Sequence, residues 1–306
     1  MLARQVNLLE QRNLIEQYLK ENPQSLSAFS FVSIFAWKDF LDYEILKLDG
    51  SLCIFAKDEA GTFMYLPPLG RNVKPATIDQ CFELMHERNN PVGKAHGVSR
   101  IENVDAKRLN LFPEKKFKRT LKAYEYCYYR KDLVALKGND YKSKRNDYNY
   151  FIKHYQPEYL PFSFNDKEEC WALYDQWSAG RKKWPRDEAY LYMLEDNRQV
   201  QQTILKNYDV LELVGRVVRV KGKIAGYTLG YPLSENMFCV LFEIADLNFK
   251  GLSVYLFREF CNDPKLAGFP FVNAMDDFAL ENIQKTKLSF RPRILFPSYT
   301  LAAPYI

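Results

Sequence analysis

The residues best suited to chemistry gather in one stretch near the C-terminal end of the chain. Asn273, Asp276 and Asp277 follow the strand-like residues 269–272 and precede a helix-like segment. A carboxylate at the end of a strand can accept a proton from an attacking amine, or hold the ammonium form in place. Either Asp would also serve as the N-cap of that helix, although a cap needs only one of them. The stretch predicts a catalytic carboxylate, with capping as the structural alternative.

Glu243 is the second candidate for acid–base chemistry. It lies in residues 237–245, a strand-like run that is otherwise almost wholly apolar. Burying a bare carboxylate is costly, so Glu243 must be paired, hydrogen-bonded or next to a cleft. A structural salt bridge and a role in a site are equally consistent with this pattern.

Several classes of site leave no trace in the sequence. No P-loop, no nucleophile elbow of the α/β-hydrolases and no His-Glu-x-x-His pair is present. The six Cys are singly spaced, without a Cys-x-x-Cys pair or a nearby His. They therefore predict scattered buried thiols in a reducing compartment and no metal site.

A basic and aromatic segment lies in the middle of the chain. Lys and Arg outnumber Asp and Glu between residues 115 and 153, although the net charge of the whole chain is only +5. Lys142, Lys144, Arg145 and Asn146 are interleaved there with Tyr residues. Such a cluster can hold nucleic-acid phosphates, and Tyr can stack on exposed bases. A solvated helix face is the alternative.

The elements that must position these residues occur twice along the chain. Each copy has two strand-like runs around a tight turn at a glycine, followed by a third strand with bulky apolar residues. The copies are centred on Gly50 and Gly222. This weak repeat predicts duplication of one α/β unit, with mixed sheets flanked by helices. We expect one domain over residues 1–120 and a second, carrying the site, over residues 121–306.

The sequence shows no targeting or membrane segment. No apolar run approaches the ~20 residues that a transmembrane helix needs. Residues 1–10 lack the basic stretch followed by an apolar one that marks a secretory signal. We therefore expect a cytoplasmic protein.

An ordered set of motifs resembles a known family. The motifs are residues 129–133, 136–138, 142–146, 194–196, 218–230, 242–245 and 285–292. Together they resemble bacterial proteins related to the C-terminal domain of phosphatidylglycerol lysyltransferase, over most of residues 25–300.

The resemblance implies a fold and a reaction. It implies tandem GNAT-like domains, similar to the Fem-type peptidoglycan aminoacyltransferases, which move an aminoacyl group from a charged tRNA onto an amine or hydroxyl. The leading interpretation is therefore an aminoacyl- or acyltransferase whose acceptor is a lipid headgroup or a small molecule. The acidic motif of the family falls on residues 273–277. The residues expected to bind substrate or tRNA are Lys142, Lys144, Arg145, Asn146, Lys287 and Arg291.

Two other interpretations stay open. In GNAT-type enzymes a glycine-rich loop at a helix N-terminus cradles the pyrophosphate of coenzyme A. Only Lys250 and Gly251 stand at that place here, so an N-acyltransferase that uses acyl-coenzyme A is a weaker alternative. Ala274 and Met275 stand where the family motif is polar, which favours a non-catalytic binding protein with a degenerate site.

Overall fold

The computed structural model describes residues 6–22, 25–90, 98–182, 188–278 and 280–303. The chain divides into two compact units. The first comprises Met1–Glu125, Asp276–Leu280 and Leu295–Ile306, and the second comprises Tyr126–Met275 and Glu281–Ile294. The division therefore falls after Glu125 instead of after residue 120, and the last strand of the chain returns to the first unit.

The first unit is a mixed sheet with three described α-helices. Its elements are α1 (Leu8–Lys20), α2 (Phe31–Ala36), β1 (Asp42–Leu48), β2 (Ser51–Lys57), β3 (Thr62–Met64), α3 (Pro75–Asn89), β4 (Arg100–Asp105), the 118–125 part of β5 (Lys118–Tyr129), and β11 (Ile294–Ala302). The strand order is β1-β2-β3-β4-β11-β5. Phe55, Phe82 and Phe112 are central to its apolar core, and each such buried side chain stabilises the fold by about 1.5–3 kcal/mol.

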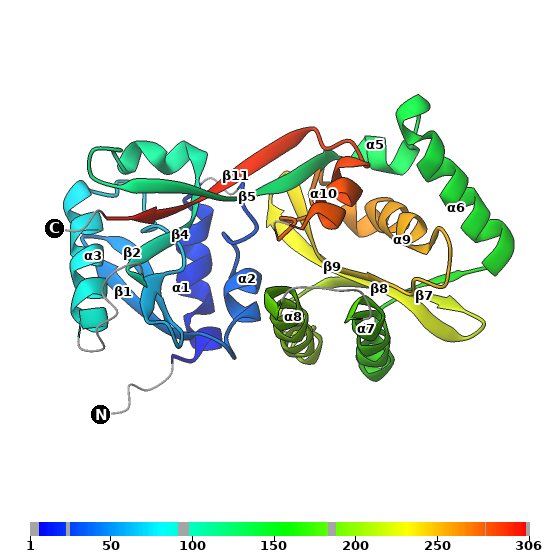
Figure 1. Cartoon of the computed structure of the whole chain (residues 1–306), viewed down its shortest axis with the longest axis horizontal. Helices are drawn as coiled ribbons and strands as arrows, with labels where there is room; N and C mark the ends of the chain where they lie inside the picture. The colour runs from blue at the N-terminus through cyan, green and yellow to red at the C-terminus, as the bar shows by residue number, and fades with distance from the viewer. Residues whose placement is uncertain (1–5, 23–24, 91–97, 183–187, 279, 304–306) are drawn as a thin grey trace. The chain divides into compact units, whose positions relative to one another are not determined.

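The second unit has the strand order β5-β10-β9-β8-β7-β6. Its elements are the 126–129 part of β5, α5 (Arg130–Ala135), α6 (Lys142–Tyr155), β6 (Glu158–Pro161), α7 (Lys167–Lys182), α8 (Glu188–Lys206), β7 (Val214–Val220), β8 (Lys223–Ser234), β9 (Met237–Ala245), α9 (Leu252–Cys261), β10 (Phe271–Asn273) and α10 (Glu281–Leu288). Helices α7 and α8 cover one face of this sheet, and α9 covers the other (Figure 1).

The two units repeat one pattern of strand pairing. Strands β1, β2 and β3 pair antiparallel in series, as do β7, β8 and β9. Strand β3 then pairs in parallel with β4, as β9 pairs with β10, and α3 and α9 lie in the two crossover connections. The fourth strand pairs antiparallel with β11 in the first unit and with β5 in the second. The predicted duplication of one α/β unit is confirmed.

The two predicted hairpin turns have the same backbone conformation. Asp49 and Gly50 have φ of 47° and 79°, and Lys221 and Gly222 have φ of 52° and 79°. Two successive residues with positive φ make the type I′ turn, whose twist matches that of the flanking strands. Glycine takes the second place because it adopts positive φ without steric cost.

Candidate active site

Strand β9 separates from β10 halfway along its length. The parallel pairs are Phe271 with Met237, Val272 with Phe238 and Asn273 with Cys239. Strand β10 ends at Asn273, while β9 continues to Ala245 and stays paired with β8. Residues 240–245 therefore have no partner strand on their β10 side in the described part of the chain, and side chains can line this opening.

Glu243 lies in the separated part of β9, opposite Thr228 of β8. Its Oε2 atom is buried and has no hydrogen-bond partner among the described residues. Burial raises the pKa of the carboxyl from its ordinary 4.5 to about 8, and the ammonium groups of Lys287 and Lys144 offset part of that rise. A carboxyl in an apolar setting keeps its proton because the charged form is poorly solvated there. Glu243 is thus mostly protonated at neutral pH.

The two lysines that act on Glu243 come from different helices of the second unit. Lys144 projects from α6 and places its Nζ atom 4.1 Å from the centroid of the Phe290 ring. Burial lowers the pKa of Lys144, while Asp147 and Glu243 raise it. Lys287 projects from α10 and donates from Nζ to the carbonyl oxygen of Ala274 at 2.6 Å. The site therefore combines a neutral carboxyl with two ammonium groups.

Asn273 ends β10 and is fully buried. Its Oδ1 atom accepts a hydrogen bond from the backbone N–H of Met275 at 2.7 Å. Met275 has a φ of 58°, which an unbranched non-glycine residue adopts only when its surroundings hold it there. The backbone N–H of Ala274 donates to the carbonyl of Tyr126, and the Tyr126 N–H donates to the carbonyl of Met275. Asn273 thus shapes the backbone at the end of the strand.

Asp276 and Asp277 belong to the first unit. The Oδ1 atom of Asp276 accepts a hydrogen bond from the Phe278 N–H at 3.1 Å, and Asp277 is buried. Helix α10 begins at Glu281, so neither Asp occupies its N-cap position. The convergence of these two acids with Glu243 and Asn273 in one cavity stays a prediction.

The corresponding opening in the first unit is bridged by its own side chains. Strands β3 and β4 share the single parallel pair of Met64 with Ile101, where β3 ends while β4 continues to Asp105. Here Asn103 donates from Nδ2 to the carbonyl of Tyr65 at 2.9 Å, and Arg108 donates to the carbonyl of Pro68 at 3.4 Å. Oδ2 of Asp105 in β4 is also a buried carboxyl oxygen without a hydrogen-bond partner among the described residues, although Oδ1 of Asp105 accepts from the Lys107 N–H at 2.8 Å. The second unit is the better candidate for chemistry because burial raises the pKa of Glu243 to about 8 and the ammonium groups of Lys287 and Lys144 act on it.

The N-terminus of α9 is packed against the backbone of α6. Gly251 has a φ of 87°, and a Cβ atom added there would lie 2.1 Å from the carbonyl oxygen of Asp147. Lys250 places its Nζ atom 4.9 Å from the centroid of the Tyr150 ring, also on α6. A carbonyl oxygen beside this helix N-terminus is a poor neighbour for a pyrophosphate. The role of Lys250 and Gly251 in binding coenzyme A stays a prediction that this geometry does not favour.

The predicted basic residues of α6 have different surroundings. Lys142 and Asn146 are exposed, whereas Lys144 is half-buried and lies over the ring of Phe290. Arg145 donates to the carbonyls of Leu136 and, at 2.7 Å, of Gly138. The remaining predicted residue, Arg291, forms an exposed ion pair with Asp140 at 3.4 Å.

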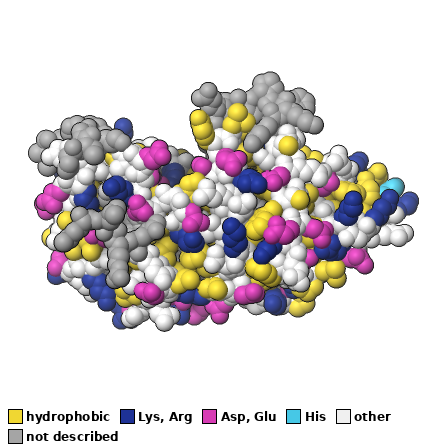
Figure 2. Space-filling view, turned by 90° about the horizontal axis from the view of Figure 1, so that it is seen from below, with side chains coloured by type: hydrophobic (Ala, Val, Ile, Leu, Met, Phe, Trp, Pro, Cys, Tyr) yellow, Lys and Arg dark blue, Asp and Glu magenta, His cyan; other side chains and the backbone are white. Residues whose placement is uncertain are grey.

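The sequence predicted a basic and aromatic segment here, but not the pair that two of its rings form at the C-terminal end of α6. The rings of Tyr150 and His154 are stacked with centroids 4.0 Å apart, next to the exposed Lys153. Figure 2 shows Lys and Arg side chains beside a His side chain at the α6 end of this unit. The spacing of four residues, which puts two side chains on one helix face, was the available signal.

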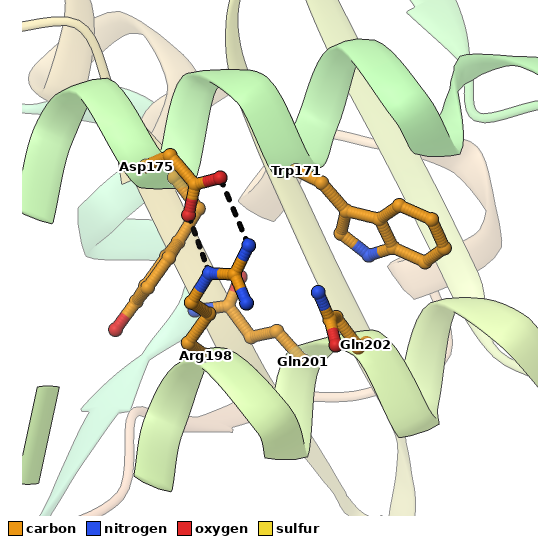
Figure 3. Close-up of a pocket in the computed structure, with 6 residues that line it drawn as sticks. Trp171, Asp175, Arg198, Gln201 and Gln202 are labelled. Atoms are coloured by element: carbon orange, nitrogen blue, oxygen red, sulfur yellow. Dashed lines mark hydrogen bonds and ion pairs between the residues drawn. The ribbon is translucent and has the colours of Figure 1, made fainter. Parts of the chain in front are cut away.

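A small hollow between α7 and α8 is a packing gap. It has almost no room for a water molecule and is lined by Trp171, Tyr174, Asp175, Arg198, Gln201 and Gln202. Arg198 and Asp175 occupy it with a two-point ion pair at 2.6 and 3.1 Å (Figure 3). It lies on the face of the sheet opposite α9 and Glu243, and its charges already neutralise each other.

The described residues were also compared with the requirements of a metal site and of a membrane-spanning helix. No group of three or more His, Cys, Asp or Glu residues among them could hold a metal ion. None of the helices that they form is both long enough and apolar enough to span a membrane.

Comparisons with known proteins agree with the motif resemblance. The profile of the family described as "Phosphatidylglycerol lysyltransferase, C-terminal" matches residues 20–302. A conserved protein of unknown function from Bacteroides thetaiotaomicron superposes with a TM-score of 0.83 at 23% identity, covering 98% of this chain and 99% of its own. No curated protein sequence matches the chain significantly.

Two more solved structures share the fold. L-PGS from Bacillus licheniformis gives a TM-score of 0.63 at 16% identity, covering 94% of this chain and 90% of its own. FemX gives 0.64 at 9% identity, covering 94% of this chain and 95% of its own. Identities this low establish the fold alone. The predicted resemblance and the predicted mixed α/β fold of tandem units are confirmed.

Proposed function

Because this chain belongs to the family of the phosphatidylglycerol lysyltransferase C-terminal domain, we propose that it transfers an aminoacyl group at Glu243. The donor in this proposal is a charged tRNA, which places the reaction in the cytoplasm. The acceptor is an amine or hydroxyl on a lipid headgroup or small molecule. Family membership supports acyl transfer in general, and the residues of the second unit support the particular chemistry.

The observation that carries this proposal is the unmatched carboxyl of Glu243. Folded proteins pair nearly all of their buried polar atoms, because an unpaired one costs about 1–3 kcal/mol. Here Oε2 has no hydrogen-bond partner in the described chain, and the pKa of the carboxyl is raised to about 8 by burial. A group with a shifted pKa on which two ammonium groups act electrostatically is typical of a functional site.

The chemistry of these three residues fits transfer from an ester. The acceptor attacks the carbonyl carbon of the aminoacyl ester, and negative charge develops on the carbonyl oxygen. Lys144 and Lys287 supply positive charge to stabilise that oxyanion. Protonated Glu243 gives its proton to the ribose oxygen as the carbon–oxygen bond of the ester breaks. The acceptor nitrogen or oxygen forms the new bond, and its released proton restores the acid form of Glu243.

This role differs from the proton acceptor expected at the end of a strand. A carboxyl with a pKa of about 8 holds a proton at neutral pH and begins the reaction as an acid. General acid catalysis is most efficient when the pKa of the acid lies near the working pH. Protonation also lets Glu243 lie beside a neutral ester without placing a bare charge in an apolar setting.

The exposed face of α6 is the surface that we assign to the tRNA. Lys142, Asn146 and Lys153 are exposed along this helix, and the ammonium groups of the two lysines can contact phosphates. Tyr150 and His154 form a stacked pair beside them, and aromatic rings stack on unpaired bases such as those of a tRNA acceptor end.

The non-catalytic alternative relied on the loss of polar side chains at Ala274 and Met275. The backbone carbonyl groups of these two residues accept hydrogen bonds within the second unit. The carbonyl of Ala274 accepts from Lys287, and the carbonyl of Met275 accepts from the N–H of Tyr126. Neither interaction depends on the side chain at 274 or 275. Apolar side chains at these two positions are therefore compatible with a site that uses their backbone carbonyl groups.

The test is transfer from a mixture of charged tRNAs by the full-length chain. The assay follows labelled amino acid from tRNA onto extracted lipids and small amines, with wild type compared with Glu243→Gln. We expect the substitution to lower the rate by about 10²–10⁴-fold, the usual contribution of general acid–base catalysis. Glu235→Gln, an exposed turn residue of the same unit, is the matched control. Transfer by Glu243→Gln at the wild-type rate would reject the proposed role.

A further inference from the structure

A short backbone relay runs from the side chain of Asn273 to the ammonium group of Lys287. We propose that Asn273 is a positioning residue, which fixes the ammonium group of Lys287 through the backbone of residues 274 and 275 and thereby sets its electrostatic effect on Glu243. Asn273 then needs no contact with substrate to affect the reaction. The expected effect of Asn273 on the transfer rate rests on the proposed function, whereas its expected effect on the protonation of Glu243 does not.

The first step of the relay is a local turn. The Oδ1 atom of Asn273 accepts the Met275 N–H at 2.7 Å, which closes a turn over one intervening residue. Met275 has a φ of 58°, in the left-handed region that favours glycine. Loss of the side-chain acceptor would leave this conformation with less support, and the backbone would relax toward negative φ.

The second step fixes the direction of one carbonyl group. The N–H of Ala274 donates to the carbonyl of Tyr126 at 2.9 Å, and the Tyr126 N–H donates to the carbonyl of Met275 at 3.2 Å. With both neighbouring groups held by Tyr126, the carbonyl of Ala274 is left to accept from Lys287 Nζ at 2.6 Å. Rotation of the backbone at Met275 would turn the intervening peptide and weaken this acceptor.

The third step carries the effect to Glu243. The carbonyl of Lys287 accepts from the hydroxyl of Tyr128 at 2.9 Å, so both ends of Lys287 are held. Its ammonium group lowers the pKa of Glu243, against the larger effect of burial, and Lys144 of α6 acts in the same sense. Cys261 of α9 also interacts electrostatically with Glu243. Release of Lys287 would remove one of the two positive groups.

The experiment uses the full chain and reads the carboxyl of Glu243 directly. Carboxyl carbons of Glu are labelled with carbon-13, the Glu243 resonance is assigned with Glu243→Gln, and its pH midpoint is measured. We expect Asn273→Ala to raise this midpoint. We also expect it to lower transfer by up to about 100-fold, because small displacements of catalytic groups cost that much.

A second variant separates positioning from substrate contact. Met275→Gly supplies a residue that adopts positive φ without help from Asn273. In Asn273→Ala combined with Met275→Gly, the turn persists, so we expect the Glu243 midpoint and the transfer rate to return toward wild type. Asp58→Ala, which removes a similar turn in the first unit, is the control and should leave the Glu243 midpoint unchanged.

The outcomes distinguish this inference from the proposed function. An unchanged Glu243 midpoint in Asn273→Ala overturns the relay. A double variant as impaired as Asn273→Ala also overturns it, and assigns Asn273 a direct role in binding substrate. If Asn273→Ala shifts the midpoint while Glu243→Gln transfers normally, the relay stands and the proposed function fails.

Discussion

The backbone oxygen of Asp147 in α6 lies where a side chain at Gly251 would begin, 2.1 Å from the position of its Cβ atom. Two helices that meet backbone to backbone need a glycine at the contact. The N-terminal turn of α9 therefore faces a carbonyl oxygen of α6. A ligand with phosphate groups would be repelled at the place where GNAT-type enzymes hold coenzyme A.

Gly251→Ala should destabilise the chain more than the same change at another glycine with positive φ. At Gly222, with a φ of 79° and no atom within 4 Å of an added Cβ, the cost is the conformational one alone, about 1–2 kcal/mol. At Gly251 the added methyl group also collides with Asp147. Denaturant unfolding of the two variants measures the difference. Equal losses would show that α6 does not pack on α9 in this way.

Charge reversal on the exposed face of α6 should weaken binding of tRNA. We choose Lys142→Glu with Lys153→Glu, because both residues are exposed, whereas Lys144 and Arg145 have internal contacts. Each lost phosphate contact lowers affinity and reduces the slope of log affinity against log salt by about 0.7–0.9.

The matched control for α6 reverses two exposed lysines elsewhere in the second unit, Lys223 and Lys265. Both double variants carry the same net charge, so a filter-binding or anisotropy titration separates a local surface from overall attraction. Equal loss of affinity in the two would reject α6 as the tRNA surface and favour the plain solvated face.

Local sequence signals were sufficient for much of the fold. Asp49-Gly50 and Lys221-Gly222 predicted two hairpins because their turn conformation depends on residues inside the turn. The boundary between units was harder, because β11 pairs with β4 across nearly two hundred residues of sequence. Such long-range pairing leaves no periodicity in the strand itself, so the return of residues 295–306 to the first unit could not be read locally.

The candidate site was visible from the sequence in part. Glu243 stood out as one carboxylate in an apolar strand, and a buried carboxyl requires an explanation. The sequence could not tell Lys142 from Lys144, although Lys142 is exposed and Lys144 lies over Phe290 and acts electrostatically on Glu243. The distinction depends on how α6 is rotated against α9, with which it shares the close contact between Asp147 and Gly251. Helical periodicity alone fixes only which residues share a face.

Asp276→Asn and Asp276→Ala together separate a structural role of Asp276 from a catalytic one. The Oδ1 atom of Asp276 accepts the Phe278 N–H, and the Asn side chain keeps such an acceptor while removing the charge. We expect Asp276→Asn to keep the melting temperature and lose activity if the charge is catalytic. Asp276→Ala should also lose about 0.5–1.5 kcal/mol of stability, the usual contribution of one hydrogen bond. Full activity in Asp276→Asn would leave Asp276 with a structural role alone.

The stability of the chain should depend on pH through Glu243 in a defined window. The pKa of this carboxyl is 4.5 in its ordinary state and about 8 in the folded chain. Below pH 4.5 the carboxyl is protonated in both the folded and the unfolded chain, so it does not lower the free energy of unfolding. Between pH 4.5 and about 8 the unfolded chain releases the proton while the folded chain keeps it, so stability falls as pH rises. Above about pH 8 the penalty is complete and constant.

Glu243→Gln removes this titration while keeping the shape of the side chain. The variant should therefore gain stability relative to wild type as pH rises from 4.5 to 8, and the gain should level off above that. The difference in unfolding free energy between the two proteins, measured across this range, cancels the other titrating groups they share. Lys144→Met should extend the window to higher pH, because Lys144 lowers the pKa of Glu243. A difference that stays flat from pH 4.5 to 8 would show that Glu243 is ionised in the folded chain, and the acid role proposed for it would fall.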